Sequence, residues 1–189
     1  MILADLALCR RLERAEGHAC VQFAAARRRL FPDSGAEWIE CGGAYAVFDG
    51  VDSPITQTFG LGIFEELSEA SLDVIERFFF DRGAQVLHEV SPLVGVAALD
   101  MLCARGYRPI EISNVLYRPV ENPPVEDHGY IRVRVTGPDE APLWTEVSAK
   151  GWTHEHPELL EFVHQAGAIS SAREQSHCFL GSVTHYVAG

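Results

Sequence analysis

Apolar and polar positions divide the first half of the chain into a helical region followed by strands. Over residues 3–30 the apolar residues recur at helical spacing, and Gly17 predicts a break into two helices. Residues 36–50 predict a β-hairpin, because two strand-like runs flank the Gly42-Gly43 pair. Residues 55–64 alternate and then become continuously apolar, which is typical of a central strand.

Helices and strands then alternate as far as residue 120. We expect a helix over 68–83, because Ser68 suits the N-cap and Gly83 suits the end of a helix. A strand, a helix that ends at Gly106, and a final strand or strand pair are predicted at 84–91, 93–106 and 107–120. This alternation predicts an α/β domain with a mixed central sheet flanked by helices.

A change of composition separates the last third of the chain. Residues 121–129 contain two prolines, three acidic residues and a glycine, which is typical of a linker. After the linker we expect a strand, two helices and a strand at 130–135, 138–150, 157–167 and 177–189. About 60 residues form only a marginal core by themselves. We therefore expect this segment to pack on the first domain or on a second copy of the chain.

Composition and charge narrow the function classes. The 189 residues are 47% hydrophobic, which is enough for a buried core, and their net charge is −12. That charge argues against a nucleic-acid or acidic membrane partner. The one basic cluster, in residues 10–29, is interpreted as a solvated helix face that pairs with Glu13 and Glu16.

The cysteines and the N-terminus predict a cytoplasmic protein. The five cysteines are an odd number, are widely spaced and contain no CxxC motif, which indicates reduced thiols. The apolar stretch at the N-terminus is too short for a signal peptide, and no apolar run is long enough to span a bilayer.

The order of elements from 36 to 120 resembles the GNAT superfamily of N-acetyltransferases. A hairpin leads to a central strand, a helix, a strand and a closing helix, and Gly106-Tyr107 resembles the family's Gly-Phe step. Residues 130–189 are similar to the opening of a second GNAT unit. The resemblance implies a tandem GNAT-like protein with a first domain at 1–120, a linker at 121–129 and an incomplete second α/β unit at 130–189.

The resemblance implies acetyl-CoA as cofactor and a small-molecule amine as substrate. In the family, a loop of the type [QR]-x-x-G-x-[GA] after the central strand holds the pyrophosphate with backbone N–H groups at a helix start. Here the corresponding residues 62–69 read GIFEELSE, and Glu65, Glu66 and Glu69 would repel phosphates. The family's tyrosine position falls at Leu102. We therefore expect the first domain to be a degenerate, structural half that does not bind acetyl-CoA in the usual way.

Candidate site residues lie in three places. His88 and Glu89 are adjacent on a predicted strand, and His88 would be a base if it lay in a cleft beside residues 55–64. Trp152, His154 and His156 are candidates for binding a substrate. His154 and His156 do not share a helix face, so we expect no metal site there. A hydrolase that uses His88 or Cys178 is a distant third class of function.

The alternative to an enzyme is a non-catalytic GNAT-like module that dimerises or binds a small ligand. The C-terminal strand has no predicted partner in the tail, and an exposed strand edge favours pairing with another chain. We therefore expect a dimer or a higher homo-oligomer.

Overall fold

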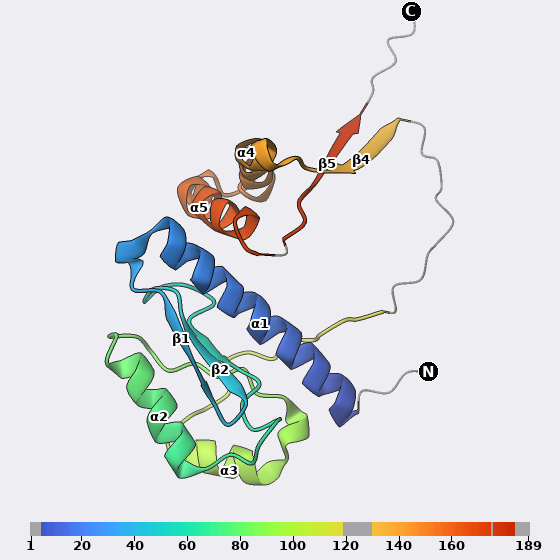
Figure 1. The fold of residues 1–189 in the computed structure, drawn as a ribbon. Coiled ribbons are helices and arrows are strands. Elements are labelled where there is room, and N and C mark those ends of the chain that lie inside the picture. The colour runs from blue at the N-terminus through green and yellow to red at the C-terminus, as the bar shows by residue number, and fades with distance from the viewer. Residues whose placement is uncertain (1–4, 119–129, 175, 184–189) are drawn as a thin grey trace, which may run out of the picture. The chain divides into compact units, whose positions relative to one another are not determined.

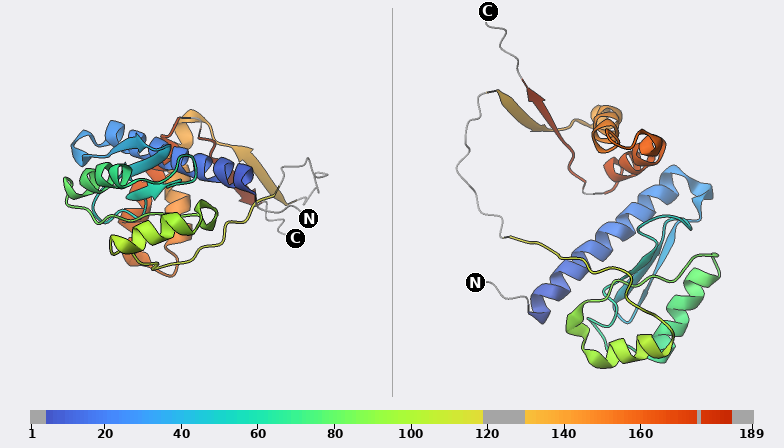
Figure 2. Two further views of the ribbon diagram at one scale, coloured as in Figure 1. Left: turned by 90° about the horizontal axis from the view of Figure 1, so that it is seen from below. Right: turned by 180° about the vertical axis from the view of Figure 1, so that it is seen from behind.

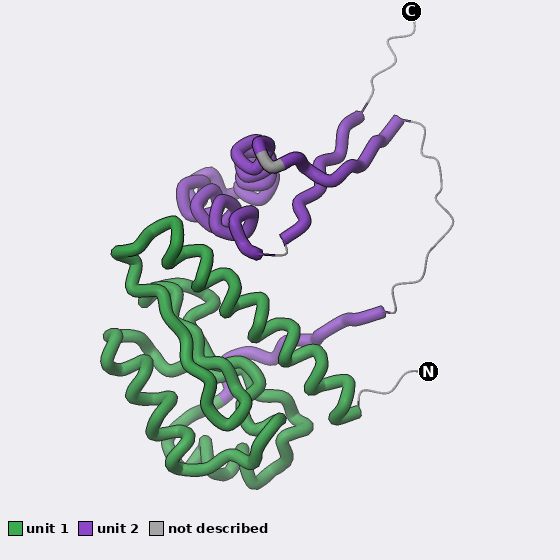
Figure 3. The backbone as a smooth tube through the Cα atoms, viewed as in Figure 1, with its two compact units in different colours: residues 1–108 green, residues 109–189 purple. Residues whose placement is uncertain are grey.

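The computed structural model describes residues 5–118, 130–174 and 176–183, and it shows a mixed α/β protein with small antiparallel sheets. The chain divides into two compact units, residues 1–108 and residues 109–189 (Figure 3). The expected linker at 121–129 lies outside the described residues.

Unit 1 is a three-layer arrangement around an antiparallel sheet. Strands β1 (Glu37–Cys41), β2 (Ala44–Phe48) and β3 (Gln57–Phe59) lie side by side in the order β1-β2-β3. Helix α1 (Leu6–Leu30) covers one face, and helices α2 (Glu69–Phe80) and α3 (Val96–Ala104) cover the other (Figures 1 and 2).

Strand β2 shows how the alternation of side chains builds a core on each face. Its Ala44, Ala46 and Phe48 pack with the buried residues of α2 and α3. Its Tyr45 and Val47 point the other way and pack with α1. The predicted hairpin over 36–50 is confirmed, and its turn is made by two glycines with positive φ.

Helix α1 is continuous, so the predicted break at Gly17 is wrong. Gly17 is buried against the sheet, where a Cβ atom would lie 2.8 Å from Tyr45 Cδ2 and 3.1 Å from Phe59 Cβ. The glycine is therefore needed for close packing of the helix on the sheet, and the helix accepts its small propensity cost.

The predicted strands at 55–64 and 84–91 are much shorter than expected. The first is limited to β3, because Gly60 and Gly62 adopt φ values of 76° and 71° and turn the chain. The second is reduced to one parallel bridge, in which Thr58 N–H donates to Leu87 O and Glu89 N–H donates to Thr58 O, each over 2.9 Å.

The helix predicted at 68–83 is confirmed as α2, with Ser68 as its N-cap and a left-handed Gly83 after its end. The helix predicted at 93–106 is divided, because Gly95 at φ 88° separates a 3₁₀ turn from α3. The strand predicted at 107–120 is wrong as far as the structure describes it, since none of residues 107–118 lies in a strand.

The described residues of unit 2 form two strands and two helices. Strand β4 (Ile131–Val135) pairs antiparallel with β5 (Phe179–Val183), and α4 (Ala141–Trp152) packs against α5 (Leu160–Ser171). Short 3₁₀ turns precede both helices. All four predicted elements are confirmed in kind, although residues 184–189 of the last one lie outside the described part.

The pairing of β5 corrects the expectation that the C-terminal strand has no partner in the tail. All five residues of β5 pair with β4, from Phe179 opposite Val135 to Val183 opposite Ile131. A wholly unpaired strand therefore cannot be the reason for a homo-oligomer.

None of the helices in the described part of the chain is long and apolar enough to cross a bilayer.

Candidate functional site

His88 lies beside strand β3 in unit 1, and its ring nitrogens are buried. Because His88 is the bridge partner of Thr58, both side chains leave the backbone on the same side. The imidazole ring lies against Tyr107, with 4.8 Å between the ring centroids. Both ring nitrogens of His88, and the hydroxyl of Thr58, are buried without a hydrogen-bond partner in the described structure.

This environment favours a structural histidine. Burial lowers the pKa of His88 from 6.5 to about 4, so the ring is neutral at pH 7. A general base must come within hydrogen-bond reach of the proton that it removes, and the buried nitrogens do not offer that reach. Glu89, the other predicted candidate, follows on an extended backbone, so its side chain leaves on the opposite side.

Beside this histidine, an ion-pair network joins α2 to the end of α3. The Arg105 guanidinium donates to carboxylates of Glu69, Asp73 and Glu76, the last two over 2.8 Å. Tyr107 donates its hydroxyl to Glu76 over 3.0 Å, and its pKa is raised mainly by burial. Arg105 was not predicted from the sequence. The i, i+4, i+7 spacing of the three acids places them on one face of α2, and this pattern could have indicated a basic partner.

The loop that follows β3 contains residues 62–69, for which a phosphate-binding loop was expected. Glu13 on α1 accepts a hydrogen bond from Gly60 N–H over 3.0 Å, and Arg10 donates to Ile63 O over 2.7 Å. Burial, the largest contribution, raises the pKa of Glu13. Glu13 was expected to pair with arginines, but it accepts from the Gly60 backbone. Helix α1 therefore holds the loop through the polar contacts of Glu13 and Arg10.

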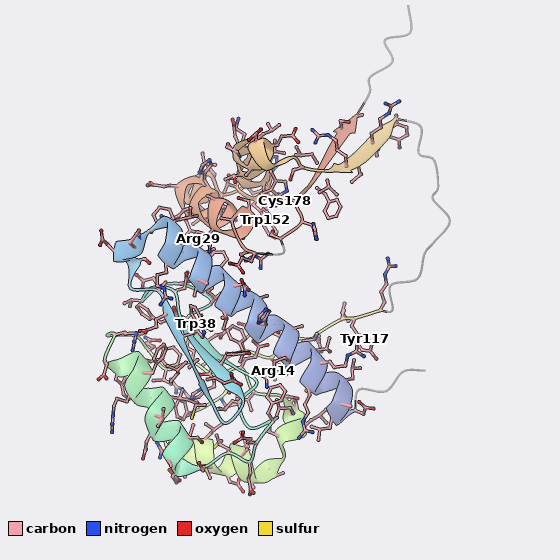
Figure 4. All side chains as sticks on the ribbon, viewed as in Figure 1. Arg14, Arg29, Trp38, Tyr117, Trp152 and Cys178 are labelled. Atoms are coloured by element: carbon pink, nitrogen blue, oxygen red, sulfur yellow. The ribbon has the colours of Figure 1, made fainter. Side chains whose placement is uncertain are left out.

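The side chain of Phe64 fills the space beside the same loop. A Cβ atom at Gly43 would lie 2.6 Å from Phe64 Cβ, and one at Gly60 would lie 2.7 Å from Phe64 Cε2. The Arg14 guanidinium carbon lies 4.0 Å from the centre of the Phe64 ring, and Arg14 also bonds to Glu40 (Figure 4). Little room is left for a ligand between the loop and the hairpin.

Backbone N–H groups at the start of α2 donate hydrogen bonds to nearby serine side chains. Ser71 N–H donates to Ser68 Oγ, and Ser68 N–H donates to Ser71 Oγ, each over 3.1 Å. The carboxylates of Glu65, Glu66 and Glu69 are exposed around this helix start. The donors that would hold a phosphate are therefore partly used, and the surrounding charge is negative.

In unit 2 the structure brings Trp152, His154 and His156 together in one hollow of about 550 Å³. The hollow lies at the C-terminal end of α4, and the remaining lining comes from Val147, Ser148, Gly151 and Glu155. Trp152 is 79% exposed there (Figure 4). An aromatic face, a carboxylate and the negative end of a helix together suit a cation.

The geometry gives little support to a hydrolase that uses Cys178 or to a metal site. Cys178 and His177 both line a smaller cavity of about 260 Å³, but the Cys178 thiol lies 3.9 Å from the Ser176 hydroxyl, which is not a base. In the described part of the chain, no three or more His, Cys, Asp or Glu side chains converge as a metal site.

Comparison of the chain with known protein families, curated proteins and solved structures finds no match. The functional conclusion therefore depends on the residues of this chain.

Proposed function

We propose that this chain is a GNAT-like protein of the acetyl-CoA-dependent N-acyltransferase type, and that its first unit is a degenerate half with a structural role. The order of elements in unit 1 supports this proposal: a hairpin, a third antiparallel strand, helix α2 and a parallel return beside β3. The parallel pairing stops after one bridge, as is expected where neighbouring strands splay apart.

One observation carries the structural role of unit 1, namely the bond between Glu13 and Gly60. A phosphate-binding loop offers backbone N–H groups to a negatively charged ligand. Here a carboxylate of the same chain accepts from Gly60 N–H, directly before the segment 62–69 where that loop is expected. A bound pyrophosphate would lie near this carboxylate and near Glu65 and Glu66, which is electrostatically unfavourable, whereas Glu69 is already paired with Arg105.

Binding of acetyl-CoA to the full chain, measured by calorimetry with free CoA as comparison, tests this assignment. We expect no saturable heat with either compound at concentrations up to about 1 mM, which corresponds to a binding free energy weaker than about −4 kcal/mol. Tight binding of acetyl-CoA would contradict the structural role and return unit 1 to the active acetyltransferases.

The second candidate function is binding of a small amine in the hollow of unit 2. The observation that favours it is the exposed indole of Trp152 beside Glu155. Alkylamines carry a positive charge at pH 7, since their pKa is close to that of lysine. A cation over the indole face and next to a carboxylate is attracted by both groups.

A matched pair of probes tests the amine site. We expect n-hexylamine to change the tryptophan fluorescence of the full chain at lower concentration than n-hexanol, which has the same apolar stem and no charge. The Glu155→Gln variant should reduce this preference by roughly tenfold, about 1.4 kcal/mol. The control is Glu158→Gln, because Glu158 bonds to His156 and does not line the hollow. Equal responses to both probes would exclude a cation site.

A further inference from the structure

The two-stranded sheet of unit 2 has one apolar face that the other described residues of this unit leave open. The β4–β5 register places five large apolar side chains on this face, and each is between 44% and 66% exposed. They are Ile131, Val133, Val135, Phe179 and Val183. We call this set the apolar face.

The opposite face of the same sheet is polar. It carries Arg132, Arg134, Leu180 and Ser182, and Arg134 bonds to Glu140 over 2.5 Å. A two-stranded sheet is at best marginally stable in water without packing on a face. The contrast between the two faces indicates that the apolar face is an interaction surface.

The shape of the apolar face is complementary to itself. Gly181 lies directly opposite Val133 at its centre, and a Cβ atom at Gly181 would have no neighbour within 4 Å, so a notch lies beside the valine. Val133 is the most exposed of the five side chains. If two such faces stack about a two-fold axis parallel to the strands, each Val133 lies over the Gly181 notch of the other copy.

The same symmetry brings the remaining apolar side chains together. Ile131 pairs with Val183 and Val135 with Phe179 in the register of one sheet. The two-fold axis therefore places Ile131 of one copy over Val183 of the second copy, and Val135 over Phe179. Interdigitated apolar side chains between stacked sheets are the normal core of a β-sandwich.

Charge does not oppose a contact between two copies at this face. Each chain has a net charge of −12, so two copies repel one another over most surfaces. The apolar face contains only Ile, Val, Phe and Gly side chains, and no carboxylate has to be buried when two of these faces stack.

We propose that a second copy of this chain covers the apolar face, with Val133 of each copy seated in the Gly181 notch of the other. We expect this dimer to form and dissociate in a concentration-dependent way.

Sedimentation of the full chain over a wide concentration range tests the proposal. The wild type is expected to pass from monomer to dimer as the concentration rises. Val133→Lys should raise the dimer dissociation constant at least about tenfold, because it buries a charge at the centre of the contact. Ser182→Lys adds the same charge on the opposite face of the sheet and should leave the dissociation constant unchanged.

A second variant tests the notch itself. Gly181→Leu fills the notch without adding charge and should also weaken the dimer, while circular dichroism shows whether the variant keeps its fold. A wild type that stays monomeric at all concentrations would overturn the proposal. Equal effects of Val133→Lys and Ser182→Lys would also overturn it, since that result indicates edge-to-edge pairing of strands.

Discussion

The two units use the same alternation of apolar and polar residues with opposite results. In unit 1, helices lie on both faces of the sheet, and Val47, Leu72 and Phe79 are completely buried. In unit 2, most side chains of β4 and β5 are exposed, and Phe179 is 55% exposed. An apolar pattern therefore predicts which side chains need to be buried, whereas the neighbouring elements determine whether and by what they are buried.

Charged residues differ between the units in the same way. In unit 1 the carboxylate of Asp49 is almost fully buried, and it accepts from Arg27 over 2.6 Å and from Ser53 over 2.7 Å. In unit 2 the Arg134–Glu140 pair remains at the surface. Buried ion pairs depend on both partners, and exposed pairs contribute little to stability.

The largest expected effect comes from removing one aromatic side chain from each unit. Phe79→Ala should lower the free energy of unfolding of unit 1 by about 3–5 kcal/mol, because it leaves a cavity in a packed core. Phe179→Ala should cost less than about 1 kcal/mol in the monomer, because the ring is already half exposed. Urea unfolding at low protein concentration measures both, and equal losses would remove the distinction between the units.

The ion pairs give the next comparison. Arg27→Met leaves the buried carboxylate of Asp49 without its cation, and we expect a loss of about 3 kcal/mol. Arg134→Met breaks an exposed pair and should change stability little. Thermal unfolding of the two variants and the wild type measures both losses. A larger decrease of the melting temperature in Arg134→Met than in Arg27→Met would contradict the prediction.

The buried histidine makes the stability of unit 1 depend on pH. The pKa of His88 is about 4 in the folded chain and near 6.5 in the unfolded chain, so the unfolded state binds more protons between these values. The free energy of unfolding is therefore highest above pH 6.5. It decreases as the pH is lowered, by about 2 kcal/mol from pH 7 to pH 5.

A comparison of two histidine variants isolates this contribution. His88→Phe should flatten the pH dependence of unfolding over this range, whereas His154→Phe in unit 2 should leave it unchanged. Chemical unfolding at several pH values is the measurement. An unaltered slope in the His88 variant would show that other groups produce the loss.

The smallest expected effect concerns the loop after β3. Glu13→Ala removes the acceptor of the Gly60 N–H group and should cost about 1 kcal/mol, with faster proteolysis in residues 60–66. Glu16→Ala on the same helix is the control, and it should change neither quantity. Equal proteolysis of the two variants would mean that Glu13 does not hold the loop.

Local rules explain which elements were predictable from the sequence. The Gly42-Gly43 turn, the Ser68 cap and the end of a helix near Gly106 depend on residues a few positions apart, and all three were predicted. The hollow at Trp152 was only partly predicted. His154, Glu155 and His156 lie in one short segment of the sequence, but their grouping with Val147 and Ser148 depends on the end of α4 and the turn that follows it.

The order of most helices and strands, the alternation within them and the negative charge near the start of α2 could be predicted from the sequence, although the strand expected at 107–120 does not form in the described residues. Only the tertiary structure decided that Gly17 stays inside a helix, that β3 stops at Phe59 and that Glu13 takes the Gly60 N–H group. The physical reason is distance along the chain. Glu13 and Gly60 are 47 positions apart, so no local pattern reports their hydrogen bond, and it forms only when α1 packs on the sheet.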